Sequence, residues 1–320
     1  MNNKVMLNIK TVNKLKLGFA AVFRIAILLA IGYIIIYPIL QMIVTSVKSQ
    51  AAFFDAARVW IPSGFDIKFN FSTALKALDY GNALKSTLLM QVLSALIEVA
   101  SCAIAAYGFA RFKFRFKNLL MAGLFLTILI PETMIIIPRV VNYSNMDFLG
   151  ILGLLNRISG VDLRPSIIGS PLAFWLPAMF AAGLRSGLLI FIYIQFFKGL
   201  PSELEEAAWV DGANPLRTFV SIAIPSSGVV ITTVSIFAVI WHWNDTLLSS
   251  MYMQKNYPLA VNLERIITTL NSFGYFSSQK VEAQAILMAA CFLFVIPPLV
   301  LYMFMQRKFI ESIDRVGITG

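Results

Sequence analysis

Four carboxylates stand close together in the stretch KGLPSELEEAAWVDGANPLRTFVSIAIPSS, at Glu203, Glu205, Glu206 and Asp211. Clustered carboxylates can serve as acid and base or hold a metal ion, but both roles normally recruit other ligands or a histidine. No histidine, cysteine or metal-ligand spacing accompanies these four residues. The chemistry that they predict is recognition of a partner, not catalysis.

Further charged residues interrupt long apolar runs, at Glu98, Glu132, Arg185 and Asp245. A charge within a bilayer is costly, so it normally faces a partner or a water-filled cavity. We therefore take these residues as candidate pathway or interhelical groups. One hypothesis is an ion pair between Glu98 and Arg185.

A Trp-His-Trp-Asn-Asp run combines aromatic faces with hydrogen-bonding groups at Trp241, Trp243, Asn244 and Asp245. Such groups bind sugars in other proteins, but an aromatic belt at the membrane interface or packing against a partner would need the same residues. His242 is the one histidine of the sequence, so no protein metal site is expected. The cysteines Cys102 and Cys291 both fall in apolar runs, where packing is their expected role.

The composition indicates a membrane protein. Of the 320 residues, 58% are hydrophobic and 13% charged, whereas soluble domains have about 45–50% and about 25%. Apolar runs of roughly 20 residues predict an all-α, polytopic helical bundle. The expected organisation is a basic segment (1–24), a transmembrane domain (25–305) and a tail (306–320). The expected spans are about 25–46, 86–109, 119–138, 172–197, 228–250 and 283–305.

Positive charge sets the expected orientation. The net charge is +10, with basic residues in short loops between apolar runs, and Arg111–Lys117 holds four of them in seven residues. This pattern marks the cytoplasmic side and anionic lipid headgroups, not nucleic acid. Both termini are therefore predicted to be cytoplasmic. The first apolar run is too long for a cleaved signal and is expected to be retained.

Two short helices joined by a turn should position the carboxylates of the 203–225 stretch. Ser202 and Glu205 fit a capping box at the start of the first helix. Gly212 suits a positive φ after it. Asn214 followed by Pro215 restarts a helix, which should end at Pro225. Physical arguments alone leave two interpretations of this helix pair. It is either a surface that docks onto a partner protein or a solvated amphipathic connector.

The spacing from Glu206 to Pro225 matches E-A-A-x(3)-G-x(9)-I-x-[LI]-P and resembles the EAA loop of bacterial ABC importer permeases. This resemblance implies a coupling helix that seats in a groove of the ATP-binding subunit. The residues to which it gives that role are Glu203, Glu205, Glu206, Ala207, Ala208, Asp211, Gly212, Ala213, Asn214 and Pro215.

PSELEEAAWVDGAN, the Trp241–Asp245 run and a GlnArgLysPheIle…Gly tail are similar to carbohydrate importer permeases of the maltose-permease type. The resemblance implies a non-catalytic subunit that forms half of an alternating-access pathway for an oligosaccharide in the bacterial cytoplasmic membrane. The implied partners are a second, homologous permease (a heterodimer), two ATP-binding subunits that hold ATP and Mg, and an extracytoplasmic solute-binding protein. In this arrangement the substrate site lies mainly in the other permease.

Three alternatives stay open. An importer of the same kind could carry a non-sugar solute. An ion-coupled transporter would need coupling carboxylates and usually internal repeats, and no clear repeat occurs here. An intramembrane enzyme would need a Ser/Lys pair, a carboxylate pair or a His-rich motif. The sequence has no G-x-x-x-x-G-K-[ST], which places ATP hydrolysis on another chain. The tail and residues 156–170 depart from the resemblance, and the sequence explains neither departure.

Overall fold

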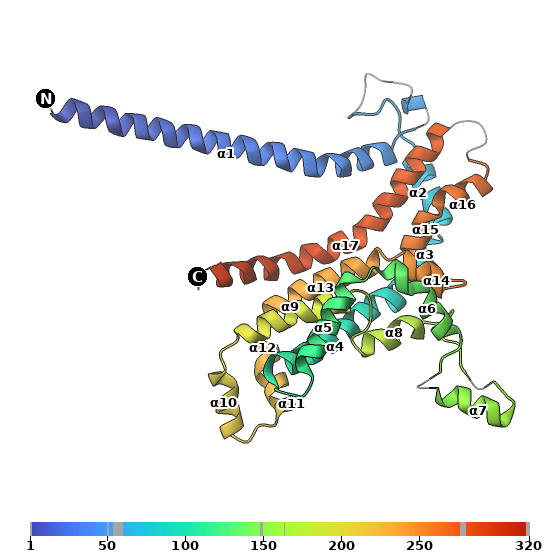
Figure 1. Ribbon diagram of the computed structural model, residues 1–320. Helices are drawn as coiled ribbons and strands as arrows, with labels where there is room; N and C mark the ends of the chain where they lie inside the picture. Colours follow the sequence, from blue (N-terminus) through green and yellow to red (C-terminus); the bar gives the residue numbers. More distant parts are fainter. Residues whose placement is uncertain are drawn as a thin grey trace. The chain divides into compact units, whose positions relative to one another are not determined.

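The structure is a computed structural model and describes residues 2–49, 51–53, 60–147, 150–162, 164–275 and 280–317. These residues form helices joined by short connections, and within them the only β-type pairing is one antiparallel bridge between Lys48 and Phe65. The all-α prediction is confirmed. The chain divides into two compact units (Figure 1), one from Met1–Ala74 with Leu270–Phe292 and one from Leu75–Thr269 with Leu293–Gly320.

The first unit contains α1 (Asn2–Ser46) and the short η1 (Ala51–Phe53). The end of α1 is fixed by Asn70, whose amide donates to the carbonyls of Ser46 and Lys48, both at 2.9 Å. Three helices begin in one unit and end in the other: α2 (Ile67–Ala77), α16 (Ile266–Ser272) and α17 (Lys280–Gly317).

The second unit holds the remaining helices, and these carry every candidate residue of the sequence analysis. In chain order they are α3 (Tyr80–Ser86), η2 (Thr87–Val92), α4 (Leu93–Arg111), α5 (Lys117–Leu129), α6 (Glu132–Ser144), α7 (Ile151–Ser159), α8 (Leu172–Met179), α9 (Ser186–Gly199), α10 (Glu203–Val210), α11 (Pro215–Thr218), η3 (Phe219–Ala223), α12 (Ile224–Ser226), α13 (Gly228–Trp243), α14 (Leu247–Tyr252) and α15 (Leu259–Glu264).

The core of the second unit forms where α4, α9 and α13 run side by side (Figure 1). Small residues on α4 and α13, among them Ala103, Ala106 and Ala238, are fully or almost fully buried there. Small side chains let helix backbones approach closely, which is how helices associate in a bilayer without a hydrophobic driving force. Tyr193 and Phe197 of α9 stack in the same core with their ring centroids 5.8 Å apart.

Helix length agrees with a membrane location. Three helical stretches are long and apolar enough to cross a bilayer by themselves: Gly18–Ser46, Tyr80–Arg111 and Ala283–Gln306. Three pairs of shorter helices, each bent at a break, pass the same criterion together, so by length and composition the described residues hold three to six candidate crossings. The six expected spans remain a prediction.

Three of those spans are interrupted, which the sequence analysis did not foresee as helix ends. The expected span 119–138 consists of α5 and α6, which meet at 104°. Ile130 has an extended conformation there (ψ 119°), because a residue that precedes proline avoids the helical region. Pro131 itself stands at the start of α6.

The expected span 172–197 consists of α8 and α9, separated by residues 180–185. Ala181 (φ 53°) and Arg185 (φ 59°) adopt the left-handed conformation that non-glycine residues rarely use. The third interruption separates α13 from α14 at Asn244–Thr246. The expected spans 172–197 and 228–250 are therefore each formed by two helices and not by one continuous helix.

The region around α7 accounts for part of the 156–170 segment. Asp147 accepts hydrogen bonds from the backbone N–H groups of Leu152 and Gly153, at 2.9 and 3.0 Å, and so caps the start of α7. After α7, Arg164 binds Asp162 at 2.9 Å. Its hydrogen bonds hold the pKa of the Asp162 carboxyl well below the usual value. This ion pair closes the turn that follows the helix.

Glycine packing between α5 and α9 gives a stability test. A Cβ on Gly187 would lie 3.1 Å from Ile128 Cγ1 and still closer to the Thr127 hydroxyl, whereas a Cβ on Gly123 would meet nothing within 4 Å. We expect Gly187→Ala to destabilise the detergent-solubilised protein by roughly 1–3 kcal/mol, because overpacking forces neighbours apart. Gly123→Ala is the matched control and should leave the melting temperature unchanged or slightly higher. Equal effects of the two substitutions would contradict this packing.

Candidate coupling loop and buried polar site

The predicted helix pair is present between Glu203 and Ser226, which we call the coupling loop. In Figure 1 its helices α10 and α11 lie together where α9 ends. Gly212 has φ 81° after α10, as expected. The Asn214 side chain accepts a hydrogen bond from the Arg217 backbone N–H at 2.8 Å, with Pro215 in the first turn. The predicted turn and restart are confirmed.

The capping box at the start of α10 is wrong. Ser202 precedes the helix, but its side chain makes no capping hydrogen bond. The Glu205 side chain instead faces Arg111 at the end of α4, with Arg111 Nε 3.0 Å from Glu205 Oε1. The same guanidinium donates to the Leu200 carbonyl at 2.8 Å. Only 4% of the Glu205 side chain and 12% of the Arg111 side chain are exposed.

This ion pair changes the assignment of the acidic residues. Because Glu205 is buried and paired within its own chain, we expect a contact with an ATP-binding subunit from the exposed carboxylates instead. Glu203, Glu206 and Asp211 are all exposed and remain candidates for that contact. The apolar residues divide in the same way. Phe219 is buried against Tyr107 of α4, with ring centroids 4.9 Å apart, whereas five others stay exposed: Leu204, Trp209, Val210, Leu216 and Val220.

A second polar site is buried in the middle of the unit. His242 of α13 lies between two side chains of the neighbouring helix run, with Nε2 2.7 Å from Glu98 Oε2 and Nδ1 3.0 Å from Gln91 Oε1. Gln91 belongs to η2, a π-helical stretch, and such turns are frequent at functional sites. The Ser186 hydroxyl of α9 donates to the other oxygen of Glu98. Three helices are thus joined through one carboxylate.

The chain of hydrogen bonds continues to Asp245. The Gln91 amide nitrogen lies 2.5 Å from the Ser249 hydroxyl and 3.4 Å from Asp245 Oδ2. Asp245 also accepts from the backbone N–H groups of Leu248 and Ser249, at 3.1 and 2.9 Å, and so caps the start of α14. Since the Gln91 nitrogen faces these acceptors, its oxygen faces His242. Both ring nitrogens of His242 therefore face acceptors.

The hypothesis of a Glu98–Arg185 pair is wrong. Glu98 is fully buried and binds His242 and Ser186. Arg185 lies outside that site, with its guanidinium carbon 5.0 Å from the centre of the Trp241 ring. Glu132 has an unexpected partner within its own helix, because Arg139, seven residues later in α6, lies 3.0 Å from it.

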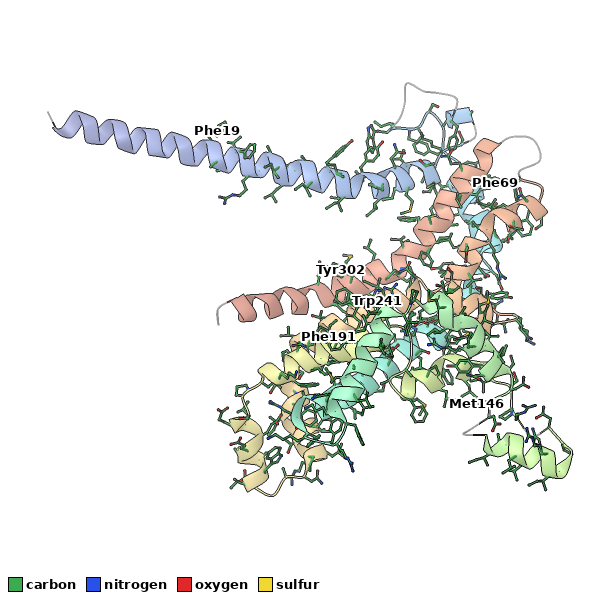
Figure 2. All side chains as sticks on the ribbon, viewed as in Figure 1. Phe19, Phe69, Met146, Phe191, Trp241 and Tyr302 are labelled. Atoms are coloured by element: carbon green, nitrogen blue, oxygen red, sulfur yellow. The ribbon has the colours of Figure 1, made fainter. Side chains whose placement is uncertain are left out.

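The Trp241–Asp245 run divides between inside and outside. Trp243 is buried and packs against Phe294, with ring centroids 5.8 Å apart. Trp241, labelled in Figure 2, contacts Phe237 at 5.5 Å as well as Arg185. Asn244 is exposed, and its amide donates to the Ile240 carbonyl at 2.8 Å.

Four residues at these sites were missed: Gln91, Arg111, Arg139 and His242. His242 belongs to the Trp-His-Trp-Asn-Asp run but was not expected to pair with a buried carboxylate, although an ionisable residue within an apolar run is itself a signal of a site. For Arg111, the sequence suggested only that it is one of the basic residues that mark the cytoplasmic side. The Glu132–Arg139 pair joins two residues of α6 that are seven positions, or about two helical turns, apart, so the sequence could have suggested it. Nothing in the local sequence could have paired Gln91 with His242, because that contact depends on packing between helices.

Two cavities open beside these residues, with volumes of about 340 and 270 Å³. Both are lined by Glu132 and Arg185. A third cavity of about 10 Å³ lies against Gln91, Arg139 and His242, and it has room for one water molecule. No group of three metal-ligating side chains occurs in the part of the chain that the structure describes.

Comparison with known proteins agrees with this architecture. Residues 100–315 match the family described as "Binding-protein-dependent transport system inner membrane component". The chain belongs to this family. It is therefore a membrane-embedded permease subunit that works with ATPase and solute-binding partners, and ATP hydrolysis takes place in separate subunits.

Relatives cover most of this chain. The alpha-glucoside transport system permease protein AglG of Rhizobium meliloti is 27% identical over 274 residues, which cover 85% of this chain and 64% of AglG, so the chain spans less than two thirds of that protein. The probable starch degradation products transport system permease protein AmyC of Thermoanaerobacterium thermosulfurigenes is 26% identical, covering 87% of this chain and 89% of AmyC.

A solved structure shares the fold. It is described as a bacterial ABC transporter involved in the import of the acidic polysaccharide alginate, and it matches with a TM-score of 0.66 at 17% identity. The match covers 91% of this permease and 96% of the other chain. The helical arrangement of the permease is thus one that occurs in ABC transporters.

Replacing the partners of the buried site one at a time and together tests its energetics. We expect Glu98→Leu or His242→Leu alone to cost roughly 3–5 kcal/mol, because each leaves a buried polar or charged partner unsatisfied. The double substitution should be markedly less harmful than the sum of the two. Thermal unfolding of the purified permease in detergent measures all three, and simple additivity would contradict the pairing.

Proposed function

We propose that this permease forms half of the translocation pathway of an ATP-driven importer for a carbohydrate, most simply an oligosaccharide. Membership of the binding-protein-dependent family supports the transport mode. The substrate class rests on relatives that are named for alpha-glucosides and for starch degradation products. The alternative of a non-sugar solute would use the same machinery.

The observation that carries this proposal is the two-sided coupling loop. Its inner side is fixed to α4 through Arg111 and Glu205 and to the core through Phe219. Its outer side presents the carboxylates of Glu203 and Glu206 beside exposed apolar residues. An exposed apolar patch with a polar rim is typical of a protein-binding surface.

The connection to α4 provides a route by which a movement of the loop reaches the other helices. Arg111 ends the same helix that carries Glu98, and Glu98 binds α9 through Ser186 and α13 through His242. A displacement of α10 by an ATP-binding subunit is therefore passed to three helices at once. Two-state rearrangement of such rigid elements is how one site biases another. We propose that ATP-driven closure rearranges the helices around the cavities by this route, which would give alternating access.

The full assembly in this proposal has a second, homologous permease, two cytoplasmic ATPases that hold ATP and Mg, and an extracytoplasmic binding protein. The termini and the coupling loop would lie on the cytoplasmic side of a bacterial cytoplasmic membrane, as the basic Arg111–Lys117 loop favours. The first helix has exposed apolar side chains along Gly18–Ser46, which suits lipid or the second permease.

A charge reversal on the outer side tests the docking. Glu206→Lys should lower co-purification of the ATP-binding subunits at least about 10-fold at low salt, because it sets like charges opposite each other. The permease itself should keep its melting temperature, since Glu206 is exposed. Glu264→Lys is the matched control, an exposed glutamate in a segment expected outside. Equal loss with both substitutions would exclude a specific contact at Glu206.

Reconstitution tests the function. Proteoliposomes that contain both permeases and both ATPases, with the glycan-loaded binding protein outside and ATP inside, should accumulate the glycan. The glycan is chosen by screening the purified binding protein against a glycan array. Omitting ATP should abolish uptake. Uptake by this chain alone, driven by a proton or sodium gradient, would overturn the proposal.

A further inference from the structure

Three helix interruptions meet around the cavities of about 340 and 270 Å³. The 340 Å³ cavity is lined by Ile130 and Glu132 at the α5–α6 break and by Ala181 and Arg185 at the α8–α9 break. The 270 Å³ cavity is lined by Asn244, Asp245 and Thr246 at the α13–α14 break, together with Glu132 and Arg185. Two shared residues thus join the cavities, whose volumes are near the range of small-ligand sites, about 300–1,000 Å³.

Helix interruptions within a membrane protein indicate where a cavity or a ligand site lies. Backbone that leaves the helix at membrane depth is tolerated only where protein buries it or where it lines a water-filled cavity. In transporters, broken helices commonly form the substrate site. Ala181 and Arg185 also hold left-handed backbone conformations, which are unfavourable for non-glycine residues and cluster at ligand sites.

The side chains at the shared wall offer both donors and acceptors. The Arg185 side chain is exposed, and among the described residues it forms no ion pair. Its contact with the Trp241 ring engages the guanidinium face and leaves the N–H groups at the edge able to donate. The Glu132 carboxylate and the Asn244 side-chain carbonyl can accept, and the ion pair with Arg139 keeps Glu132 in place.

We propose that these cavities form a sugar-contact site on this permease itself. The Arg185 guanidinium donates to sugar hydroxyl oxygens, and Glu132 and Asn244 accept from sugar hydroxyl groups. Trp241 is a positioning residue, because it touches Arg185 and Phe237 and so fixes the guanidinium over the cavity. The proposal rests on the proposed carbohydrate function and adds that this subunit, and not its partner permease alone, selects the sugar.

Uptake kinetics of the complete reconstituted complex test the site. The probe is radiolabelled maltotriose or, if the binding protein selects another glycan, that glycan. Arg185→Ala should raise the KM for loaded binding protein or lower uptake per ATP hydrolysed by about 10-fold, which corresponds to one lost charge-assisted contact. Arg185→Lys should recover part of this loss, and Trp241→Leu should act in the same direction as Arg185→Ala. Arg265→Ala is the matched control and should leave uptake unchanged, because Arg265 is likewise an exposed arginine over an aromatic ring, that of Tyr257, but lines neither cavity.

A direct measurement separates contact from indirect effects. A diazirine derivative of the same glycan, photolysed in the complex trapped with ATP and vanadate, should label peptides that contain residues 181–187 or 240–246. Labelling of the second permease alone would overturn the site, as would unchanged uptake by Arg185→Ala.

The assembly of the variants is checked in parallel. Loss of the second permease from purified Arg185→Ala complex would assign Arg185 to the permease interface and overturn the sugar contact. If the unmodified complex takes up no glycan at all, the carbohydrate function fails and this site with it. Normal glycan uptake by Arg185→Ala would remove the site and leave the function intact.

Discussion

The contact between Glu98 and His242 is the interaction on which the second unit depends. A carboxylate and an imidazole are 2.7 Å apart where both side chains are almost completely buried. Leaving either group without its partner would be costly there, so α4 and α13 have one favourable register. Ser186 extends the same constraint to α9, and Gln91 extends it to Asp245 and hence to the start of α14.

Around this fixed centre the polar groups fall into two kinds. Those on the inside, from Glu98 to Ser249, are satisfied by one another and hold helices in register. Those at the helix breaks, notably Arg185 and Asn244, are exposed to cavities. The second kind supplies the groups to which we propose that the sugar binds. The coupling loop repeats the division, with Glu205 buried and Glu206 exposed.

The sequence predicted the class of fold, the coupling loop, its glycine turn and its Asn214–Pro215 restart, because these follow from local rules of hydropathy and capping. It did not predict the position of the Glu205 side chain, because Glu205 forms an ion pair with Arg111, which lies almost a hundred residues earlier in another helix. The sequence also suggested the wrong partner for Glu98. Several charged residues interrupt apolar runs, and the sequence gives no distances by which to choose among them. In the sequence, the only signs of the helix breaks at Ile130 and Arg185 are Pro131, which follows Ile130, and the charge of Arg185 itself. Left-handed backbone at Ala181 has no sequence signal at all.

The burial of Glu205 against Arg111 also bears on how such importers could be rebuilt. A loop that only touched an ATP-binding subunit could be grafted from one permease to another to change which ATPase drives it. Here the graft boundary cannot fall at the ends of the loop, because half of its anchoring ion pair and much of its aromatic seat belong to α4 and α9. The smallest exchangeable module therefore includes the ends of those two helices that lie next to the loop.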